Sequence, residues 1–324
     1  MQVANGPVRG RFAPSPTGDL HLGNARTALL AWLQVRSAGG EFVLRAEDLD
    51  PTRSRPEYLT RQLAELRWLG LGWDEGPDVG GPFGPYLQSD RQDAFATALA
   101  ELQHKGMTFP CYCSRKEILA AASAPQQGDD EGPAYPGTCL ERADSADFAA
   151  AGDRRDVAIR MKVPPDPVCF HDLVMGERCS EPLRETGAFV VRRKDGVAAY
   201  QLAVVVDDHL MRITHVLRGA DLLASTARQI LLYRALGWEP PLWAHVPLML
   251  GADAERLAKR HGAVSLGEMR AKGVRPEAIV GWLAWTSGLL DRSEPVEAAS
   301  LVKDFTIDRL RRTPTVVDTP PFQF

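Results

Sequence analysis

The sequence predicts an α/β fold with a parallel sheet, an insertion at residues 109–187 and a helical region at residues 251–324. Apolar segments of strand length alternate with helical patterns up to residue 105, and this alternation is typical of a parallel sheet. The alternation breaks at residue 109, where cysteines, alanines and an acidic Gly/Pro-rich stretch appear, and it resumes near residue 189. After residue 250 the patterns are helical. We therefore assign residues 1–108 and 188–250 to one sheet-containing domain.

The first predicted unit is a strand, a tight loop and a helix. A strand at residues 8–13 runs into a loop with Pro14 and Pro16, and residues 24–36 then carry apolar side chains at helical spacing before Gly39. The chain continues with a strand at 41–46 and helices at 56–69 and 89–105. In the last of these helices, Ser89 and Gln92 have the spacing of a capping box.

The second half of the domain repeats this alternation. Apolar runs separated by turn residues predict four strands. Apolar side chains at 3.6-residue spacing predict three helices, one that ends at Gly237 and two near the end of the chain. The predicted strands are 189–193, 199–206, 214–217 and 243–250, and the predicted helices are 225–236, 276–289 and 304–312.

Composition excludes several classes of protein. The 324 residues are 44% apolar and 25% charged, which is ordinary for a globular chain and excludes a disordered or fibrous one. Lys and Arg (38) against Asp and Glu (42) give a net charge of -4, so there is no global basic field for non-specific nucleic-acid binding. The longest apolar runs are too short to span a bilayer, which predicts no membrane partner. Five cysteines without a secretory signal predict a cytoplasmic protein with no disulfide framework.

A conspicuous motif lies between the first strand and the first helix, at residues 11–24, with the sequence ArgPheAlaProSerProThrGlyAspLeuHisLeuGlyAsn. Phosphates bind readily at helix N-termini in α/β folds, where His21, Gly23 and Asn24 are expected. A lone histidine at a helix start is more often a simple cap. The full motif, however, resembles the first signature of class I aminoacyl-tRNA synthetases in its glutamyl form. The resemblance implies that His21 is catalytic and that His21, Gly23 and Asn24 bind ATP.

A second motif, GluArgLeuAlaLysArgHisGly at residues 255–262, is by itself a common solvated basic turn. In this order after residues 11–24 it resembles the mobile lysine loop of the same enzymes. The resemblance implies that Lys259 stabilises charge on the transferring phosphoryl group and that Arg256 also binds ATP. Arg256 and Ala258 replace the lysine and serine of the usual pattern, and Arg256 keeps the positive charge.

A third segment, residues 45–53, places Glu47 after the second predicted strand. On spacing alone a carboxylate there more often interacts with a helix dipole than with a ligand. The glutamyl resemblance implies that it belongs to an amino-acid pocket in which Arg218 supplies a guanidinium for the substrate carboxylate. The implied glutamate-binding residues are Arg11, Phe12, Ala13, Pro14, Ser15, Glu47, Tyr200 and Arg218. We predict structural or indirect roles for the cluster Asp207, Asp208 and His209.

A fourth set consists of Cys111, Cys113, Tyr135 and Cys139. A close cysteine pair with distant partners can close a loop around zinc, but cysteines at i and i+2 can equally be buried thiols on one strand. The set resembles the metal site of the glutamyl-Q tRNA(Asp) branch of the family, which implies one structural Zn²⁺ held by these four residues. Cys169 and Cys179 fall outside that pattern and are predicted to be ordinary thiols.

Taken together, the resemblance covers residues 8–310. It implies a Rossmann-like class I synthetase catalytic domain with a zinc-bearing insertion and a C-terminal region like a tRNA stem-contact domain, without an anticodon-binding domain. The implied reaction activates L-glutamate with ATP and Mg²⁺ without tRNA, then transfers it to queuosine in the anticodon of tRNA(Asp), in a monomeric enzyme. Two alternatives stay open: a minimal enzyme that charges tRNA(Glu), and a non-catalytic tRNA-binding paralogue.

Overall fold

The computed structural model describes residues 7–114, 116–118, 134–141, 157–251, 253, 265–317 and 322. The strands are β1 (Arg9–Phe12), β2 (Glu41–Leu44), β3 (Thr108–Cys111), β4 (Ala158–Met161), β5 (Val168–Asp172), β6 (Gly176–Ser180), β7 (Phe189–Arg192), β8 (His215–Gly219), β9 (Leu242–Val246), β10 (Met249–Gly251) and β11 (Thr315–Val317). The α-helices are α1 (Leu22–Ser37), α2 (Pro56–Trp68), α3 (Gln92–His104), α6 (Pro182–Glu185), α7 (Tyr200–Leu210), α8 (Leu223–Leu236), α9 (Leu266–Ala271), α10 (Pro276–Ser287) and α11 (Ala298–Leu301).

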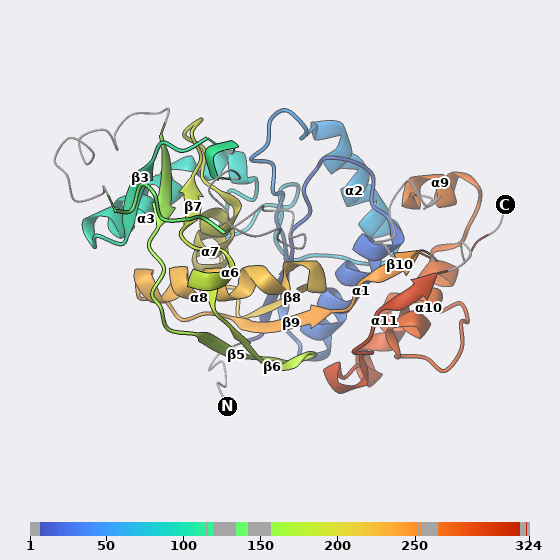
Figure 1. The fold of residues 1–324 in the computed structure, drawn as a ribbon. Coiled ribbons are helices and arrows are strands. Elements are labelled where there is room, and N and C mark those ends of the chain that lie inside the picture. The colour runs from blue at the N-terminus through green and yellow to red at the C-terminus, as the bar shows by residue number, and fades with distance from the viewer. Residues whose placement is uncertain are drawn as a thin grey trace.

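The main sheet has six strands in the order β2-β1-β8-β9-β5-β6. Figure 1 shows β8, β9, β5 and β6 in succession. Neighbouring strands of this sheet pair in parallel, except that β5 and β6 form an antiparallel hairpin at one edge. A second, antiparallel sheet contains β3, β4 and β7, and β10 pairs in parallel with β11. The predicted α/β fold with a parallel sheet is therefore confirmed.

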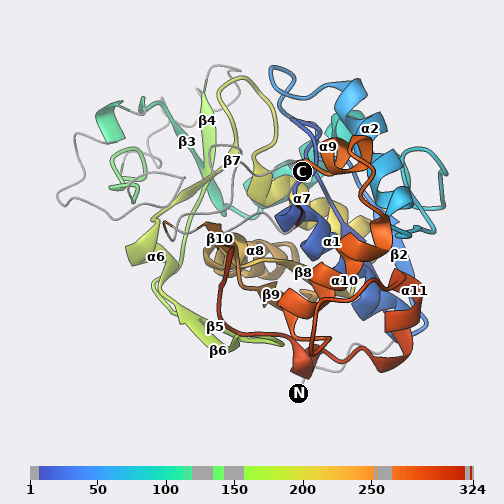
Figure 2. The same cartoon turned by 90° about the vertical axis from the view of Figure 1, so that its right-hand side faces the viewer.

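Helices cover both faces of the main sheet. In β2, Phe42 and Leu44 join the core formed with α1 and the C-terminal helices, whereas Val43 joins the core formed with α3, α7 and α8. Alternate residues of a strand point to opposite faces, so a strand that is buried on both sides contributes side chains to two cores. The helices α9, α10 and α11 lie on the side of α1 and α2 (Figure 2).

Several helices end as their sequences predict. Pro276 occupies the first turn of α10, where a missing N–H costs no helical hydrogen bond. Gly288 ends α10 and Gly237 ends α8 in the left-handed conformation, with φ of 89° and 76°, which glycine adopts without a Cβ penalty. Among the described residues, no helix is long and apolar enough to cross a bilayer.

The prediction of a strand at residues 199–206 is wrong, because this segment begins the helix α7. Every side chain from residue 201 to residue 208 is buried. A helix that is buried on all sides lacks a polar stripe, so its apolar run cannot be told from a buried strand by periodicity.

Three further boundaries differ from the prediction. The capping box at Ser89 is wrong, since a 3-10 turn at Gln88–Arg91 precedes α3 and the Ser89 hydroxyl donates to Asp48 instead, at 2.6 Å. The strand predicted at 243–250 is interrupted at Pro247, which has no N–H to donate. Residues 304–312 form short 3-10 turns rather than an α-helix.

The segment predicted as one insertion contributes to two sheets. Its hairpin β5-β6 extends the main sheet, while β7, which follows it in sequence, joins β3 and β4.

The prediction that Cys169 and Cys179 are ordinary thiols, and that the chain has no disulfide framework, is wrong. These residues lie opposite each other on β5 and β6, with Cα atoms 4.1 Å apart, and form a disulfide. Paired cysteines on neighbouring strands come close enough for their sulfur atoms to bond, but the pairing of the strands is not visible in the sequence.

Candidate active site

A cavity of about 820 Å³ opens at the carboxyl end of the parallel strands, where ligands of α/β folds bind. It is bounded by the end of β1, the loop that follows, the first turns of α1 and α7, the end of β8 and the loop after β9. Eleven of the predicted site residues line it: Arg11, Phe12, Ala13, Pro14, Ser15, His21, Gly23, Asn24, Glu47, Tyr200 and Arg218. Arg256 and Lys259 lie outside the described residues.

The N-terminus of α1 forms one wall of this cavity. His21 is the N-cap residue, and its backbone N–H donates to Asn24 Oδ1 at 3.3 Å. A Cβ added to Gly23 would meet no described atom within 4 Å, so the space beside it is open. The N–H groups of the first turn and the dipole of this 16-residue helix thus face a space that can hold an anion.

The chain that follows the segment with Arg256 and Lys259 returns to His21. Ser265 forms a β-bridge with His21, and the N–H of Leu266 donates to the carbonyl oxygen of Leu20 at 2.9 Å. Glu65 accepts hydrogen bonds from the backbone N–H groups of Leu20 and Gly267, and burial raises its pKa to about 7. These contacts hold Ser265 and the residues that follow it beside the helix terminus.

Arg218 is a buried guanidinium with neutral partners. It donates to His245 Nε2 (2.9 Å), Gln229 Oε1 (2.9 Å), Thr226 Oγ1 (2.9 Å) and the Leu222 carbonyl oxygen (3.2 Å). No ion pair joins it to a carboxylate of the described residues, and burial lowers its pKa. A buried cation without a counterion is costly, and a ligand carboxylate would supply the missing charge.

Two other buried arginines near the pocket, Arg11 and Arg45, are paired with carboxylates. Arg11 donates from Nε and Nη2 to the two oxygens of Asp208 at 3.2 and 3.1 Å, and Arg45 donates to the same carboxylate at 2.7 Å. Asp207 accepts hydrogen bonds from Arg91 and Gln88. The predicted indirect role of the acidic pair agrees with these contacts, since both carboxylates neutralise guanidinium groups below the pocket.

Glu47 supplies the acidic side of the cavity. Its carboxylate accepts a hydrogen bond from Arg45 at 3.1 Å, and it lines the cavity together with Tyr200. Burial nevertheless raises the pKa of Glu47. A substrate ammonium beside it would compensate the loss of solvation.

Sequence reasoning missed three groups here. Arg45 belongs to the segment at residues 45–53, and its spacing predicts no role for it, although it is completely buried between Asp208 and Glu47. His245 and Arg26 carried no motif; Arg26 lines the cavity from α1, donates to the Pro247 carbonyl oxygen and has its pKa lowered by burial to about 10. The signal available for Arg26 was its position on the apolar face of the first helix, five residues after His21.

The three cysteines of the predicted metal set come together. The sulfur atoms of Cys111, Cys113 and Cys139 all lie within 4.8 Å of one another, with 3.4 Å between Cys113 and Cys139. The Tyr135 hydroxyl lies 3.7 Å from the Cys111 sulfur and 3.9 Å from that of Cys113, and it accepts the N–H of Cys139 at 2.7 Å. Sulfur atoms at about 2.3 Å from a tetrahedral zinc are about 3.8 Å apart, so the donor set fits one such ion.

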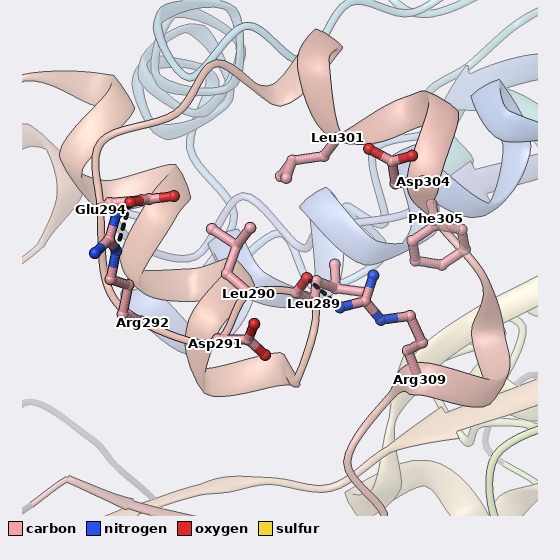
Figure 3. A pocket seen from close by; sticks show the side chains of 9 residues that line it. All are labelled: Leu289, Leu290, Asp291, Arg292, Glu294, Leu301, Asp304, Phe305 and Arg309. Atoms are coloured by element: carbon pink, nitrogen blue, oxygen red, sulfur yellow. Dashed lines mark hydrogen bonds and ion pairs between the residues drawn. The ribbon is translucent and has the colours of Figure 1, made fainter.

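A smaller cavity of about 470 Å³ lies after the end of α10, and Figure 3 shows the side chains around it. Arg292 pairs with Glu294 at 2.7 Å, and Arg309 donates to the Leu289 carbonyl oxygen at 2.9 Å. The guanidinium groups are therefore engaged within the wall, and none of the predicted site residues reaches this cavity.

Comparison with known proteins agrees with this geometry. The family described as tRNA synthetases class I (E and Q), catalytic domain, matches residues 7–321. A glutamyl-Q tRNA(Asp) synthetase of Symbiobacterium thermophilum is 56% identical over 94% of both chains, and one of Nitratidesulfovibrio vulgaris is 50% identical over 87% of both. Glutamate–tRNA ligase 2 of Syntrophus aciditrophicus is 43% identical over 96% of this chain and 64% of its own length. A crystal structure of a glutamate tRNA ligase from Elizabethkingia meningosepticum in complex with its amino acid superposes with a TM-score of 0.83, at 30% identity, over 96% of this chain and 67% of that one.

Proposed function

Because the chain belongs to the class I tRNA synthetases of the glutamate and glutamine type, we propose that it activates L-glutamate with ATP and transfers it to queuosine in tRNA(Asp). Two relatives, at 56% and 50% identity over most of their length, are named for that activity. The observation that carries the amino-acid assignment is Arg218, a buried guanidinium in the cavity wall whose hydrogen-bond partners among the described residues are all neutral.

In the proposed pocket, the side-chain carboxylate of glutamate binds Arg218 and its ammonium lies beside Glu47 and Tyr200. This arrangement directs the α-carboxylate toward the N-terminus of α1, where the phosphates of ATP would bind beside His21, Gly23 and Asn24. Arg26 adds positive charge to the same wall. Both substrates would then be held in one cavity, which removes much of the entropic cost of bringing them together.

The first step forms a bond between an oxygen of the α-carboxylate and the α-phosphorus of ATP, and breaks the bond from that phosphorus to the bridging oxygen of pyrophosphate. A carboxylate is ionised at neutral pH, so the step needs no general base. His21 and the N–H groups of α1 stabilise charge on the phosphoryl oxygens, and we assign Lys259 and Arg256 to the same task. Mg²⁺ bound with ATP would neutralise further phosphate charge.

In the second step a hydroxyl of the queuosine ring attacks the activated carbonyl carbon. The new ester bond forms as AMP leaves, and the hydroxyl proton is released. Arg11 and Arg45 bind Asp208 below the pocket. Arg218 therefore does not pair with that carboxylate, and its positive charge is available to the substrate.

We also propose that Cys111, Cys113, Tyr135 and Cys139 hold one structural Zn²⁺. The donor set fits a tetrahedral ion, and it joins the end of β3 to residues 134–141. The ion would organise the three-stranded sheet and takes no part in the chemical steps.

The test is transfer of radiolabelled glutamate, with ATP and Mg²⁺, to three RNAs: tRNA(Asp) with queuosine, tRNA(Asp) without it, and tRNA(Glu). We expect label on the queuosine-bearing tRNA(Asp) alone. Label on tRNA(Glu) instead would support the second candidate, a charging enzyme like the glutamate–tRNA ligases that are 43% identical to this chain. Absence of label together with absence of glutamate-dependent ATP–pyrophosphate exchange would overturn both and leave a non-catalytic tRNA-binding protein.

A further inference from the structure

Three neighbouring strands of the main sheet carry a continuous line of buried polar side chains. Arg218 on β8 lies directly opposite His245 on β9, and Asp172 at the end of β5 is next to β9 in the sheet. Asp172 and His245 have no exposed surface and Arg218 is 4% exposed. Arg218 lines the substrate cavity, whereas the other two lie behind it.

The carboxylate of Asp172 has a fixed orientation. Its Oδ1 accepts hydrogen bonds from the backbone N–H groups of Val174 (3.0 Å), Met175 (2.8 Å) and His245 (3.1 Å). Its Oδ2 is thereby directed at the imidazole and lies 2.6 Å from His245 Nδ1. An ionised carboxylate accepts hydrogen bonds and cannot donate one, so Nδ1 must carry the proton.

A proton on Nδ1 leaves the lone pair of His245 on Nε2. Burial lowers the pKa of His245 to about 4, so the ring is neutral at neutral pH. Nε2 therefore accepts from Nε–H of Arg218 at 2.9 Å. This bond, with those to Gln229, Thr226 and Leu222, engages four of the five N–H groups of the guanidinium and fixes its plane.

We propose that Asp172 and His245 are positioning residues that orient Arg218 for the side-chain carboxylate of the amino-acid substrate, and so determine the preference for glutamate over glutamine. The inference rests on the proposed function, in which Arg218 binds that carboxylate. The new element concerns the tautomer of His245, which lies outside the pocket and is fixed by the carboxylate of Asp172 on the next strand. This tautomer determines whether Arg218 presents its remaining Nη1 N–H to the substrate at the correct angle. Charge-assisted hydrogen bonds depend strongly on such geometry.

The variant Asp172→Asn tests the tautomer with the smallest change in shape. Its Oδ1 can keep the three backbone hydrogen bonds, which places the NH₂ group against Nδ1 of His245. The proton must then move to Nε2, where it opposes the N–H of Arg218. We expect KM for glutamate to rise about 10-fold, and the ratio of kcat/KM for glutamate to that for glutamine to fall about as much, because the loss of one well-aligned hydrogen bond to a charged group has an effect of that size. KM for ATP should change less than 2-fold.

A matched pair of substitutions at His245 provides the rescue. In His245→Gln the amide oxygen can reach the position of Nε2 and accept from Arg218, whereas the shorter side chain of His245→Asn reaches only the position of Nδ1. We expect the glutamine variant to retain most of the glutamate affinity and the asparagine variant to resemble Asp172→Asn. A purely structural role of the histidine would affect KM for glutamate and for ATP alike, in both variants.

The assay is glutamate-dependent ATP–pyrophosphate exchange, with thermal unfolding of each variant as the folding control. If the wild-type protein does not exchange, the proposed function fails; if it exchanges and folded Asp172→Asn keeps the KM and selectivity of the wild type, the positioning proposal is overturned. Should the variants not fold, ¹⁵N–¹H NMR of the wild type labelled at its seven histidines still decides. A buried neutral ring protonated at Nδ1 supports the proposal, and seven rings without such a tautomer contradict it.

Discussion

His21 and Ser265 pair across a β-bridge, although 244 positions separate them in the sequence, and the residue that follows Ser265 donates to the carbonyl oxygen of Leu20. Ser265 also begins α9, where its hydroxyl accepts from the N–H of Glu268 and the Glu268 carboxylate accepts from the N–H of Ser265 at 2.8 Å. The same residue therefore caps a helix and fixes the chain next to the proposed phosphate site. In the sequence, the segment with Arg256 and Lys259 ends at this point.

The first prediction concerns that cap. Ser265→Ala removes the hydroxyl acceptor and should lower the free energy of unfolding by about 1 kcal/mol. Because the chain there is anchored to His21, we expect KM for ATP to rise more than KM for glutamate. Urea unfolding and pyrophosphate exchange measure the two effects. Glu268→Gln keeps a capping-box residue and is the control, so an equal loss of ATP affinity in that variant would argue against the anchoring role.

The second prediction concerns His21 itself. His21→Ala should reduce kcat of glutamate-dependent pyrophosphate exchange by about 100-fold, the usual effect of losing one preorganised donor to a developing charge. His21→Asn is the informative companion, because asparagine is a good N-cap residue and should keep the stability of α1 without the imidazole. Exchange within a few-fold of wild type in both variants would show that the phosphate site has been assigned to the wrong residue.

A third prediction follows from Glu65, whose pKa burial raises to about 7 from an ordinary value of 4.5. Above pH 4.5 the unfolded chain releases this proton while the folded protein keeps it, so the folded state binds more protons and stability must fall as the pH rises from about 5 to 7. The full effect is roughly 3 kcal/mol. Glu65→Gln keeps an acceptor for the N–H groups of Leu20 and Gly267 but does not titrate. Urea unfolding at pH 5, 6, 7 and 8 should show a smaller decline for the variant, and parallel curves would exclude Glu65 as the source.

The disulfide between Cys169 and Cys179 gives a fourth prediction. It closes a loop of about 11 residues, and the chain-entropy relation gives about 2–3 kcal/mol for such a loop. Cys169→Ser should lower the free energy of unfolding by up to that amount, and a reductant should then cause no further loss. Thiol titration of the unfolded, unreduced protein should find three of the five cysteines free. Five free thiols in a protein purified without reductant would contradict the bridge.

Much of the fold is visible in local patterns, whereas contacts between distant segments are not. Helix α10 is marked by Pro276 and Gly288, and the loop with His21 precedes its helix as the motif predicts. The helix α7 reads as a strand because it is buried on all sides. The same helix brings Asp208 under Arg11, and the placement of β5 beside β9 brings Asp172 to His245. These pairings depend on the strand order, which no local pattern contains.

The metal set supplies the last prediction. Metal analysis of the purified protein should find one zinc per chain. Cys139→Ala should abolish zinc binding, because that change leaves two thiols and a phenol that already accepts a backbone N–H. Tyr135→Phe should keep some zinc but release it faster to a chelator. Removal of zinc should expose residues 111–141 to proteolysis while the main sheet, whose core lies elsewhere, keeps its cooperative unfolding. Chelation that removes the metal and leaves the proteolysis pattern and the transfer to tRNA(Asp) unchanged would rule out an organising role for the ion.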